Sequence, residues 1–262
     1  MTLFLAGLAG AAVYAVLERL NARAKKRQRG WFGPWPIRQV PLQEFDPSFT
    51  FDERGPTVAT EAWFVGTGTF SVVGGTSDFE AWILAAMAKR ATSLFEFGTC
   101  TGKTTYLWAR NAPSPARIVT ITLAPAARDT VVAAPGDRAT DVKVSVQEST
   151  FTRFLYTGTP VEAKITQLYG DSKGFDETPY TGGVDLLFVD GSHAYSYVVS
   201  DSAKALRMVK PGGVVLWHDY RGPWRAAGVF KALNELNRTT PLVHLAGTSL
   251  VAYRRPMQGA SR

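Results

Sequence analysis

The segment that decides the fold is Leu94-Phe95-Glu96-Phe97-Gly98-Thr99-Cys100-Thr101-Gly102-Lys103-Thr104. A short apolar run ends next to an acidic residue, and a Gly-x-x-x-Gly loop then leads into a helical pattern. Glycine lets a backbone turn sharply and approach a ligand closely. Glu96, near the carboxyl end of the strand, is able to accept hydrogen bonds from an amino group or a hydroxyl. The segment therefore predicts a strand, loop and helix that bind a nucleotide-type ligand.

Two phosphate-binding patterns fit this loop poorly. A Walker A loop ends in Gly-Lys-Ser/Thr, as Gly102-Lys103-Thr104 does, but its first glycine would fall on Phe97. A dinucleotide fingerprint has the form G-x-G-x-x-G, and this loop lacks the middle glycine. A tight turn without a ligand is the remaining alternative, and the motifs farther along the chain argue against it.

The composition indicates one main domain with an N-terminal appendage. The chain has 262 residues, of which 45% are hydrophobic and 12% aromatic, so it can bury a sizeable core. Its single cysteine, Cys100, excludes an intrachain disulfide and a cysteine-based zinc cluster. Because Cys100 lies inside the glycine loop without a histidine nearby in sequence, we interpret it as a small loop residue and not as a nucleophile.

The positive charge is concentrated at the N-terminus. The formal net charge is +7, and residues 1–30 contain six Lys or Arg residues against one acidic residue, Glu18. That segment carries +5, which leaves only +2 for the other 232 residues. Nucleic acid is therefore not the expected partner, because phosphate binding needs a basic face on the folded part.

Residues 1–29 are predicted to form a membrane-anchor helix with a basic flank. The first 17 residues have no charged side chain, and the Lys and Arg residues follow directly. A helix of that length spans about 26 Å, against ~30 Å for the hydrocarbon core. Basic residues on the carboxyl side predict a single-pass protein whose catalytic domain lies in the cytoplasm. A helix packed on the domain or on a partner is the alternative.

Residues 30–76 are rich in Trp and Pro and show little periodicity, so we expect an irregular linker that covers the domain. Regular structure is predicted to begin at Ser77. Ser77 and Glu80 form a capping-box pattern, and apolar residues follow at helical spacing. The domain itself is expected over residues 77–255, with a tail at 256–262.

From residue 91 onward, strand and helix patterns alternate, which predicts an α/β fold. The expected strands are 93–97, 117–123, 163–169, 184–190 and 214–218, with helices 102–110 and 195–209 between them. Pro211-Gly212-Gly213 is expected to end the second of these helices. Strands 242–246 and 250–253 are separated by a short turn and predict an antiparallel pair. The fold class is therefore a Rossmann-like, doubly wound, mainly parallel sheet with an antiparallel C-terminal edge hairpin, plus an N-terminal apolar helix.

Five motifs in this order resemble a known enzyme family. They are Glu-x-Gly-x-x-x-Gly at 96–102, Gly170-Asp171-Ser172, Phe188-Val189-Asp190-Gly191-Ser192-His193-Ala194-Tyr195, Lys210-Pro211-Gly212-Gly213 and Trp217-His218-Asp219-Tyr220. Together they resemble class I S-adenosylmethionine-dependent methyltransferases. The closest resemblance is to the small-molecule O-methyltransferase branch that includes macrocin-type and cephalosporin-hydroxylase-like proteins. It covers roughly residues 77–254.

The resemblance implies S-adenosylmethionine as the cofactor. Residues at the first glycine loop would hold its methionine end, and those after the third strand would lie near adenine. An aspartate after the fourth strand would face the reacting end. The cofactor-binding residues implied are Glu96, Gly98, Thr99, Gly102, Thr104, Thr122, Asp171, Ser172 and Asp190.

The second strand departs from the family pattern. In the family this strand normally ends in an acidic residue that binds both ribose hydroxyls, and here Thr122 stands in that place. A threonine offers one neutral hydroxyl, so a charge-assisted hydrogen bond worth roughly 1.5 to 3 kcal/mol would be lost. Either the affinity for the cofactor is lower, or another residue, such as Asp129, compensates.

A second group of residues predicts the chemistry. Asp190, His193, His218 and Asp219 follow two strands that should be neighbours, so their side chains should converge. Asp190, His218 and Asp219 suit a divalent cation, Mg²⁺ or another metal. His193 and Asp190 are the expected catalytic residues, with His193 as general base. Catalysis by His193 without a metal is an alternative. So are purely structural roles, namely a helix cap for His193, a buried structural imidazole for His218 and loop hydrogen bonds for Asp219.

The sequence thus predicts a methyltransferase that acts on a hydroxyl of a small-molecule, sugar or lipid-linked acceptor with the assistance of a divalent metal. Three alternatives stay open, of which a nucleic-acid methyltransferase is disfavoured by the charge of only +2 on residues 31–262. The second is a binding or scaffold protein that kept the fold and lost turnover, which would explain Thr122. The third is a metal-dependent, hydroxylase-like enzyme, because a fold alone does not fix the chemistry.

Overall fold

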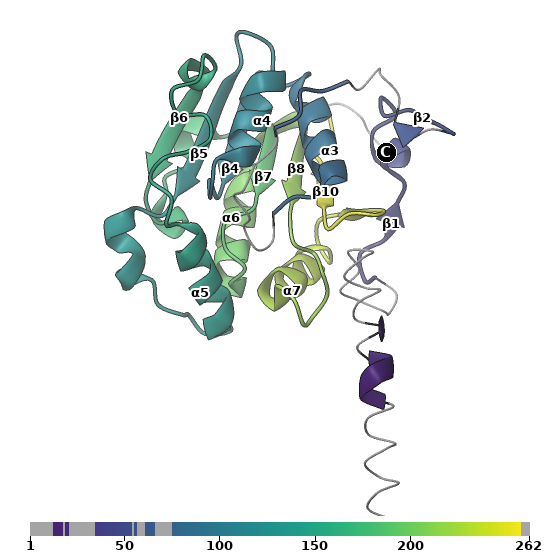
Figure 1. Ribbon diagram of the computed structural model, residues 1–262, viewed down its shortest axis with the longest axis vertical. Coiled ribbons are helices and arrows are strands. Elements are labelled where there is room, and N and C mark those ends of the chain that lie inside the picture. The colour runs from purple at the N-terminus through teal and green to yellow at the C-terminus, as the bar shows by residue number, and fades with distance from the viewer. Residues whose placement is uncertain are drawn as a thin grey trace, which may run out of the picture.

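An eight-stranded sheet with helices on both faces organises the domain (Figure 1). The computed structural model describes residues 13–17, 19–20, 35–53, 55–56, 61–65 and 75–257. The strand order is β1-β9-β10-β8-β7-β4-β5-β6, and β10 runs antiparallel to both of its neighbours. The strands of this sheet are β1 Gln39–Val40, β4 Ser93–Phe97, β5 Arg117–Thr122, β6 Ile165–Tyr169, β7 Val184–Val189, β8 Val209–Trp217, β9 Val243–Leu245 and β10 Val251–Arg254.

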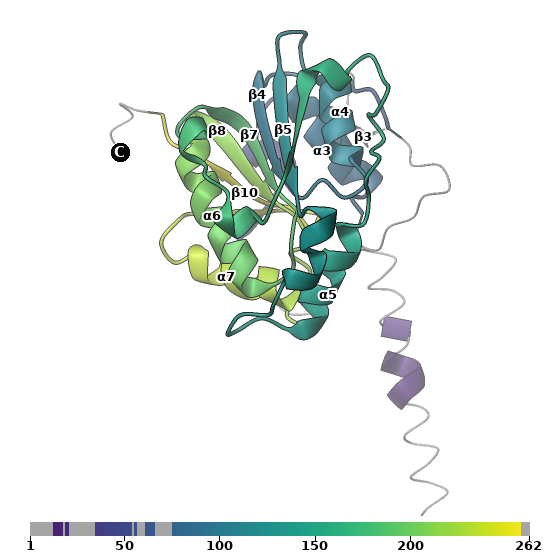
Figure 2. The same cartoon turned by 90° about the vertical axis from the view of Figure 1, so that its left-hand side faces the viewer.

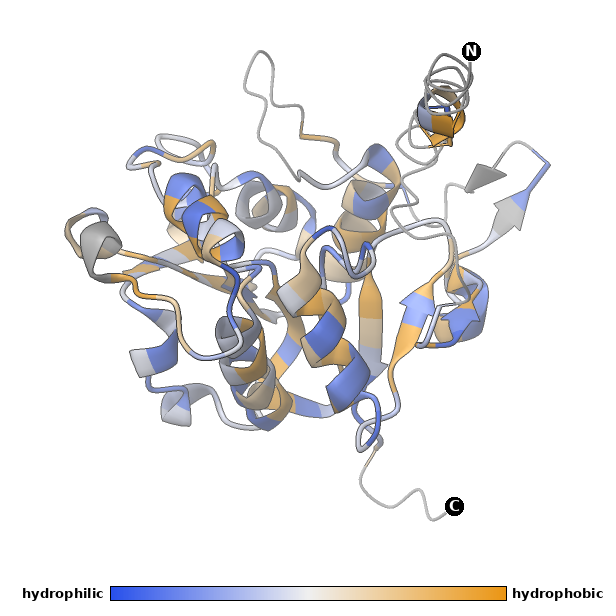
Figure 3. Cartoon of the chain, turned by 90° about the horizontal axis from the view of Figure 1, so that it is seen from below, coloured by the Kyte–Doolittle hydropathy of each residue, from blue (hydrophilic) through white to orange (hydrophobic). Residues whose placement is uncertain are grey.

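The helices form two layers, one on each face of the sheet (Figure 2). One layer contains α3 (Asp78–Ala88) and α4 (Lys103–Asn111), and the other contains α6 (Tyr195–Met208) and α7 (Ala227–Leu236). Each layer buries its own set of apolar side chains against the sheet. Figure 3 shows the hydrophobic residues concentrated on the strands and on the helix sides that face them. The remaining elements are α2 (Leu42–Phe45), α5 (Ala139–Glu148) and a small hairpin of β2 (Phe51–Asp52) and β3 (Gly55–Pro56).

The predicted α/β alternation is confirmed. The expected strand at 93–97 has the same bounds as β4, and the other expected strands of the parallel part overlap β5, β6, β7 and β8. Helices α4 and α6 follow at the expected places. The C-terminal pair is β9 and β10, which pair antiparallel as expected. The doubly wound, mainly parallel sheet is therefore the fold of this chain.

Two expectations differ from the structure. Pro211-Gly212-Gly213 was expected to end a helix, but these residues lie within β8. Val184 of β7 pairs with Val209 of β8, and Leu186, two residues farther along β7, pairs with Val214. The extra residues of β8 between these two pairs form a bulge. Gly212 supports this bulge with a φ of 78°.

Within the expected irregular linker, β1 pairs in parallel with β9 and lies at the edge of the sheet.

The capping box that begins α3 is confirmed. The hydroxyl of Ser77 accepts a hydrogen bond from the Glu80 backbone N–H at 3.2 Å, and Glu80 Oε2 accepts one from the Ser77 backbone at 2.8 Å. The side chain of Glu80 is fully buried and also accepts hydrogen bonds from the backbone N–H and hydroxyl of Ser249, at 2.6 and 2.8 Å. Glu80 therefore ties α3 to the turn between β9 and β10.

Most of the expected N-terminal membrane helix lies outside the described residues. Residues 13–17 and 19–20 are helical, and five of their large hydrophobic side chains are exposed to solvent. Among the residues that the structure describes, no helix is long and apolar enough to cross a membrane. The membrane anchor over residues 1–29 therefore stays a prediction.

Candidate functional site

The candidate site lies at the carboxyl ends of the parallel strands. The strand order reverses between β4 and β7, because the chain leaves β4 toward one side of the sheet and later returns on the other. Ligands of open α/β sheets bind at such a switch point. Two cavities of about 590 and 490 Å³ open here, and they share Gly98, Cys100, Glu148 and Asp190 in their walls.

Gly98 brings the end of β4 against the end of β7. Its φ is 102°, which side chains rarely allow, and a Cβ atom there would lie 2.2 Å from the Asp190 backbone oxygen. The neighbouring backbone is paired as well, because the Asp190 N–H donates to the Phe97 carbonyl at 2.8 Å. Only glycine permits this close approach, and the approach places Asp190 at the boundary of both cavities.

Glu96 lies in the wall of the smaller cavity, together with Thr99 and Thr104. Its Oε2 accepts hydrogen bonds from the hydroxyls of Thr105 and Thr120, the latter at 2.8 Å. Burial raises the pKa of Glu96 to about 8, and the nearby charge of Asp190 adds to the rise although the threonine hydrogen bonds oppose it. The carboxyl group is therefore mostly protonated at neutral pH.

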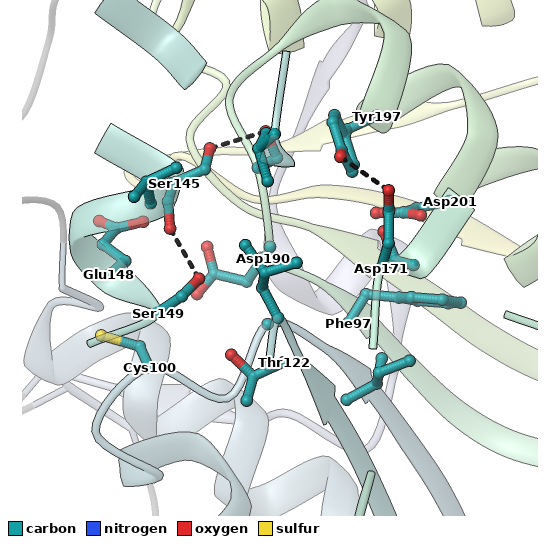
Figure 4. Close-up of a pocket in the computed structure, with 18 of the residues that line it drawn as sticks. Phe97, Cys100, Thr122, Ser145, Glu148, Ser149, Asp171, Asp190, Tyr197 and Asp201 are labelled. Carbon is teal, nitrogen blue, oxygen red and sulfur yellow. Dashed lines mark hydrogen bonds between the residues drawn. The ribbon is translucent and has the colours of Figure 1, made fainter. Parts of the chain in front are cut away.

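Three of the residues expected near ribose and adenine lie in the wall of the larger cavity, namely Thr122, Asp171 and Ser172. Figure 4 shows Thr122 and Asp171. Asp171 Oδ1 accepts a hydrogen bond from the Lys173 backbone N–H at 2.9 Å, and Oδ2 accepts one from the Tyr197 hydroxyl at 3.1 Å. Both carboxylate oxygens of Asp171 thus already have protein partners. Thr122 ends β5, as expected.

Gly102 lies apart from the lining of both cavities. It is the N-cap residue of α4 with a φ of 76°, and a Cβ atom there would meet Tyr156 and Phe154 at 2.8 and 2.9 Å. Glycine is therefore needed at position 102 because the side chains of Tyr156 and Phe154 leave no room for a Cβ atom. Cys100 is partly buried, and burial raises the pKa of its thiol to about 12, which agrees with a loop residue that is not a nucleophile.

The second predicted group converges as expected. His218 Nδ1 lies 3.1 Å from Asp190 Oδ1 and 3.1 Å from Asp219 Oδ2, and His193 Nε2 lies 2.7 Å from the same Asp219 oxygen. Asp219 adopts a φ of 61°, a left-handed conformation that is uncommon for a residue other than glycine. The side chain of His218 is fully buried. The structure therefore brings together all four residues from two strand ends.

The charges of this group depend on one another. Burial alone would raise the pKa of Asp219, but His218 and His193 outweigh it and hold that pKa well below its usual range. Burial would lower the pKa of His193, but Asp219 outweighs it and raises that pKa to about 9. The pKa of His218 is raised well above its usual range by Asp219 and Asp190, against the effect of burial. Without a metal, the imidazoles are therefore the cations that neutralise the buried carboxylates.

The donor atoms of Asp190, His218 and Asp219 fit a divalent cation. One ligand atom from each lies within 4.8 Å of the others. Neighbouring ligands at metal distances of about 2.1 Å in octahedral geometry lie about 3 Å apart, which matches the two 3.1 Å separations here. Neither ring nitrogen of His218 makes a hydrogen bond of regular geometry in the described part of the chain. Nδ1 nevertheless lies 3.1 Å from an oxygen of each carboxylate, so it is a buried nitrogen that is placed to ligate a metal.

Glu80 completes this arrangement on the far side of His218. Its Oε2 lies 3.5 Å from His218 Nε2, while Nδ1 faces the carboxylates. Histidines that bind metals usually turn their second nitrogen toward a carboxylate, which fixes the tautomer. The sequence assigned Glu80 only to a helix cap, because its second role depends on a contact between residues 138 positions apart.

Two further charged residues were missed in the sequence. Lys103 lies in the wall of the smaller cavity, where its Nζ donates to the Thr76 carbonyl at 3.3 Å. Glu148 is shared by both cavities and belongs to α5, a helix that the sequence did not predict. The Gly-Lys-Thr triplet that resembles the end of a Walker A loop was the only available signal for Lys103.

Part of the chain matches a known protein family. Residues 95–220 match a family described as a methyltransferase domain. This match includes the glycine loop, the strand ends and both predicted groups of site residues. This segment is therefore similar to a methyltransferase domain, and the doubly wound sheet with cavities at its switch point agrees with the class I S-adenosylmethionine-dependent fold.

Solved structures with a similar fold include three O-methyltransferases, from Klebsiella pneumoniae, Streptomyces achromogenes and Bacillus cereus. The first is a putative O-methyltransferase, 16% identical over 70% of this chain and 83% of that one, with a TM-score of 0.47. The second, TomG bound to SAM, is 18% identical over 70% and 82%, with a TM-score of 0.44. The third, bound to SAH, is 16% identical over 70% and 84%, with a TM-score of 0.46. No curated protein matches the chain.

Replacing Gly98 by alanine should damage both the fold and the site. The left-handed φ and the 2.2 Å approach to the Asp190 backbone predict a loss of stability of roughly 2 to 4 kcal/mol. Urea unfolding measures this loss. The matched control is Gly174→Ala, because a Cβ atom at Gly174 meets nothing within 4 Å. Equal stability of the two variants would contradict the close approach of β4 and β7.

Proposed function

We propose that this chain transfers the methyl group of S-adenosylmethionine to a hydroxyl of a small-molecule, sugar or lipid-linked acceptor, with the assistance of a divalent metal. The observation that carries the proposal is the position of Asp190. It lies where the two switch-point cavities meet and also faces His218 and Asp219. A cofactor site and a cation site therefore share one carboxylate.

The two cavities match the two ends of the cofactor. Asp171 and Ser172 line the larger cavity, which suits adenosine, and Glu96, Thr99 and Thr104 line the smaller one, which suits the methionine end. Lys103 offers the methionine carboxylate a positive charge. When bound, S-adenosylmethionine supplies a sulfonium methyl group that an oxygen nucleophile is able to accept.

A calorimetric titration with S-adenosylmethionine tests the cofactor and the role of Glu96 together. The carboxyl group of Glu96 is protonated below pH 8 in the free protein, and pairing with the cofactor's ammonium group would ionise it. Binding at pH 7 should therefore release nearly one proton, and the affinity should rise about tenfold between pH 6 and pH 7. Titrations in buffers of different ionisation enthalpy measure the released proton.

Two variants complete this titration. Glu96→Gln should abolish both the proton release and the pH dependence, whereas the exposed Glu162→Gln should leave both unchanged. Binding without proton release would remove Glu96 from the cofactor site. Absence of any binding would favour a scaffold protein that kept the fold without turnover.

A divalent cation at Asp190, His218 and Asp219 would supply a Lewis acid that favours the deprotonated form of an acceptor hydroxyl. Mg²⁺ prefers oxygen ligands, whereas the imidazole of His218 also suits Mn²⁺ and other transition metals. Asp190 and Asp219 each place a carboxylate oxygen 3.1 Å from Nδ1 of His218, whose imidazole is buried. These contacts hold the three side chains in fixed positions.

Mn²⁺ binding measured by electron paramagnetic resonance tests this site. Wild-type protein should bind one equivalent, and His218→Ala should weaken binding by at least about tenfold, since a removed metal ligand or its supporting carboxylate typically costs that much. Binding should strengthen as pH rises, because Nδ1 must lose its proton to bind a metal. His244→Ala is the control, since His244 Nε2–H donates to the Thr248 carbonyl at 2.8 Å in the β9–β10 turn and His244 is not part of the cluster. Equal Mn²⁺ binding by both variants would exclude His218 as a ligand.

His193 is the proposed general base, acting beside Asp219. Only its neutral form accepts a proton, and its pKa lies at about 9 in the metal-free protein. With an identified acceptor, the rate of methyl transfer should therefore increase with pH toward 9, as measured by single-turnover assays. His193→Ala should lose this increase. A rate independent of pH between 7 and 9 in the wild type would assign the proton to another group.

We also propose that residues 1–29 attach the domain to a membrane, with the domain on the cytoplasmic side. The support is the uncharged run of residues 1–17 followed by the basic cluster. Deleting residues 1–29 should move the protein from the membrane pellet to the supernatant after ultracentrifugation. Replacing the six Lys and Arg residues of this segment by Gln is the companion variant, and should change orientation more than attachment. Sedimentation of the deletion variant with membranes would refute the anchor.

A further inference from the structure

The cofactor's ribose presents two hydroxyl groups, and a carboxylate is the side chain that best accepts hydrogen bonds from both. At the end of β5, where such a carboxylate would lie, the chain has Thr122. Thr122 lines the larger cavity but offers a single neutral hydroxyl. The cavity therefore needs a carboxylate from another element if ribose is to be held by a charged acceptor.

Four carboxylates line the larger cavity, and two of them are engaged elsewhere. Asp171 accepts from the Lys173 backbone and from Tyr197, and Asp190 faces His218 at 3.1 Å. Asp201 on α6 has an Oδ1 without a hydrogen-bond partner among the described residues, but the residue is only 1% exposed. Asp171 and Asp190 therefore have little capacity left for a ligand, and Asp201 has little accessible surface.

Glu148 is the fourth carboxylate, and it is available. Within the described residues, neither of its oxygens makes a hydrogen bond or an ion pair, and the residue is only partly buried. The neighbouring hydroxyls are already used, since Ser149 donates to the Ser145 carbonyl at 2.8 Å and Ser145 is bonded to Ser192 at 2.7 Å. Figure 4 shows Glu148 beside Ser149 and Asp190, across the cavity from Asp171 and Tyr197.

The helix that carries Glu148 is fixed over the strand ends. Helix α5 lies beyond the ends of β5 and β6, near the start of α6 (Figures 1 and 2). Val142 packs against Ala194 and Tyr197, and the bond between Ser145 and Ser192 joins the helix to the loop after β7. These contacts hold α5, whose last residue is Glu148, against the loop after β7 and the start of α6.

The position of Glu148 along the cavities matches the middle of the cofactor. It lines both the cavity that suits adenosine and the cavity that suits the methionine end. Ribose connects these two parts of S-adenosylmethionine, so it must lie where the cavities meet. The residues there are Gly98, Cys100, Glu148 and Asp190, and of these only Glu148 has a carboxylate without a protein partner among the described residues.

We propose that Glu148 is the ribose-binding carboxylate of this chain and performs from the covering helix α5 the role that Thr122 does not supply from β5. The proposal rests on the proposed cofactor. It assigns to α5 a direct part in cofactor recognition, so that docking of this helix and binding of the ribose support each other. The competing role for Glu148, a general base toward the acceptor, predicts a different outcome in the experiment below.

The experiment is a double-mutant cycle between Glu148 and the ribose hydroxyls. Calorimetry would measure the affinity of full-length wild type and Glu148→Gln for S-adenosylhomocysteine and for its 2′,3′-dideoxy analogue. Removing the hydroxyls from the ligand should weaken binding to the wild type by about tenfold to a hundredfold. Glu148→Gln should weaken binding of S-adenosylhomocysteine by a similar factor, and the two changes together should cost little more than either alone.

Two results would overturn the proposal. Equal weakening of both ligands by Glu148→Gln would show that the residue supports α5 and does not contact ribose. Unchanged affinity for S-adenosylhomocysteine, with a loss confined to the rate of transfer, would assign Glu148 to the acceptor. Failure of the wild type to bind either ligand would instead refute the proposed function, on which this proposal rests. Gln147→Ala, an exposed change on the same helix, is the control and should bind both ligands like the wild type.

Discussion

The close approach of β4 and β7 at Gly98 is the constraint on which the rest of the site depends. Two parallel strands at the centre of the sheet send their following loops in opposite directions, and the backbone of Gly98 touches the backbone of Asp190 where they part. Without a side chain at Gly98, the loop after β4 can lie flat against the end of β7. The two cavities open on either side of this contact, so one backbone position sets the location of both.

Buried charge is the second constraint, and two segments far apart in sequence, α3 and the residues that follow β8, satisfy it together. Asp219 is almost fully buried, and so are His218 and Glu80. Isolated charges at such depth would be costly, but here each carboxylate lies next to an imidazole. The carboxylate of Glu80, the imidazole of His218 and the carboxylate of Asp219 follow one another in space, and their alternating charges keep these side chains in one arrangement. The three side chains proposed to bind a cation and the capping residue Glu80 are therefore parts of the same network.

Much of the fold could be predicted from sequence because the central strands β4 and β7 are mainly apolar and are followed directly by Gly98 and Asp190. The convergence of Asp190, His193, His218 and Asp219 was predictable for the same reason, since adjacent parallel strands end at one edge of the sheet. The bulge in β8 was not, because proline and two glycines normally end an element, and only pairing with β7 keeps them in a strand. A two-residue strand such as β1 has too few residues for a periodic pattern.

Helix α5 was missed for a specific reason. Val142, Val144 and Val146 alternate with polar residues, which is the pattern of a half-buried strand and disfavours a helix. The packing of Val142 under α6 and the hydrogen bond from Ser145 to Ser192 override that preference. Because Glu148 belongs to this helix, its place in the cavity wall could not be seen in the sequence. Thr122 at the end of β5, which motivates the proposal for Glu148, could be seen there.

The most direct test of the account is a crystal structure of the full chain with S-adenosylhomocysteine and Mn²⁺. The account predicts adenosine in the cavity lined by Thr122 and Asp171, the sulfur atom near Asp190, and an anomalous peak for manganese between Asp190, His218 and Asp219. Ligand density elsewhere on the protein would contradict it. Empty cavities at a saturating ligand concentration would contradict it as well.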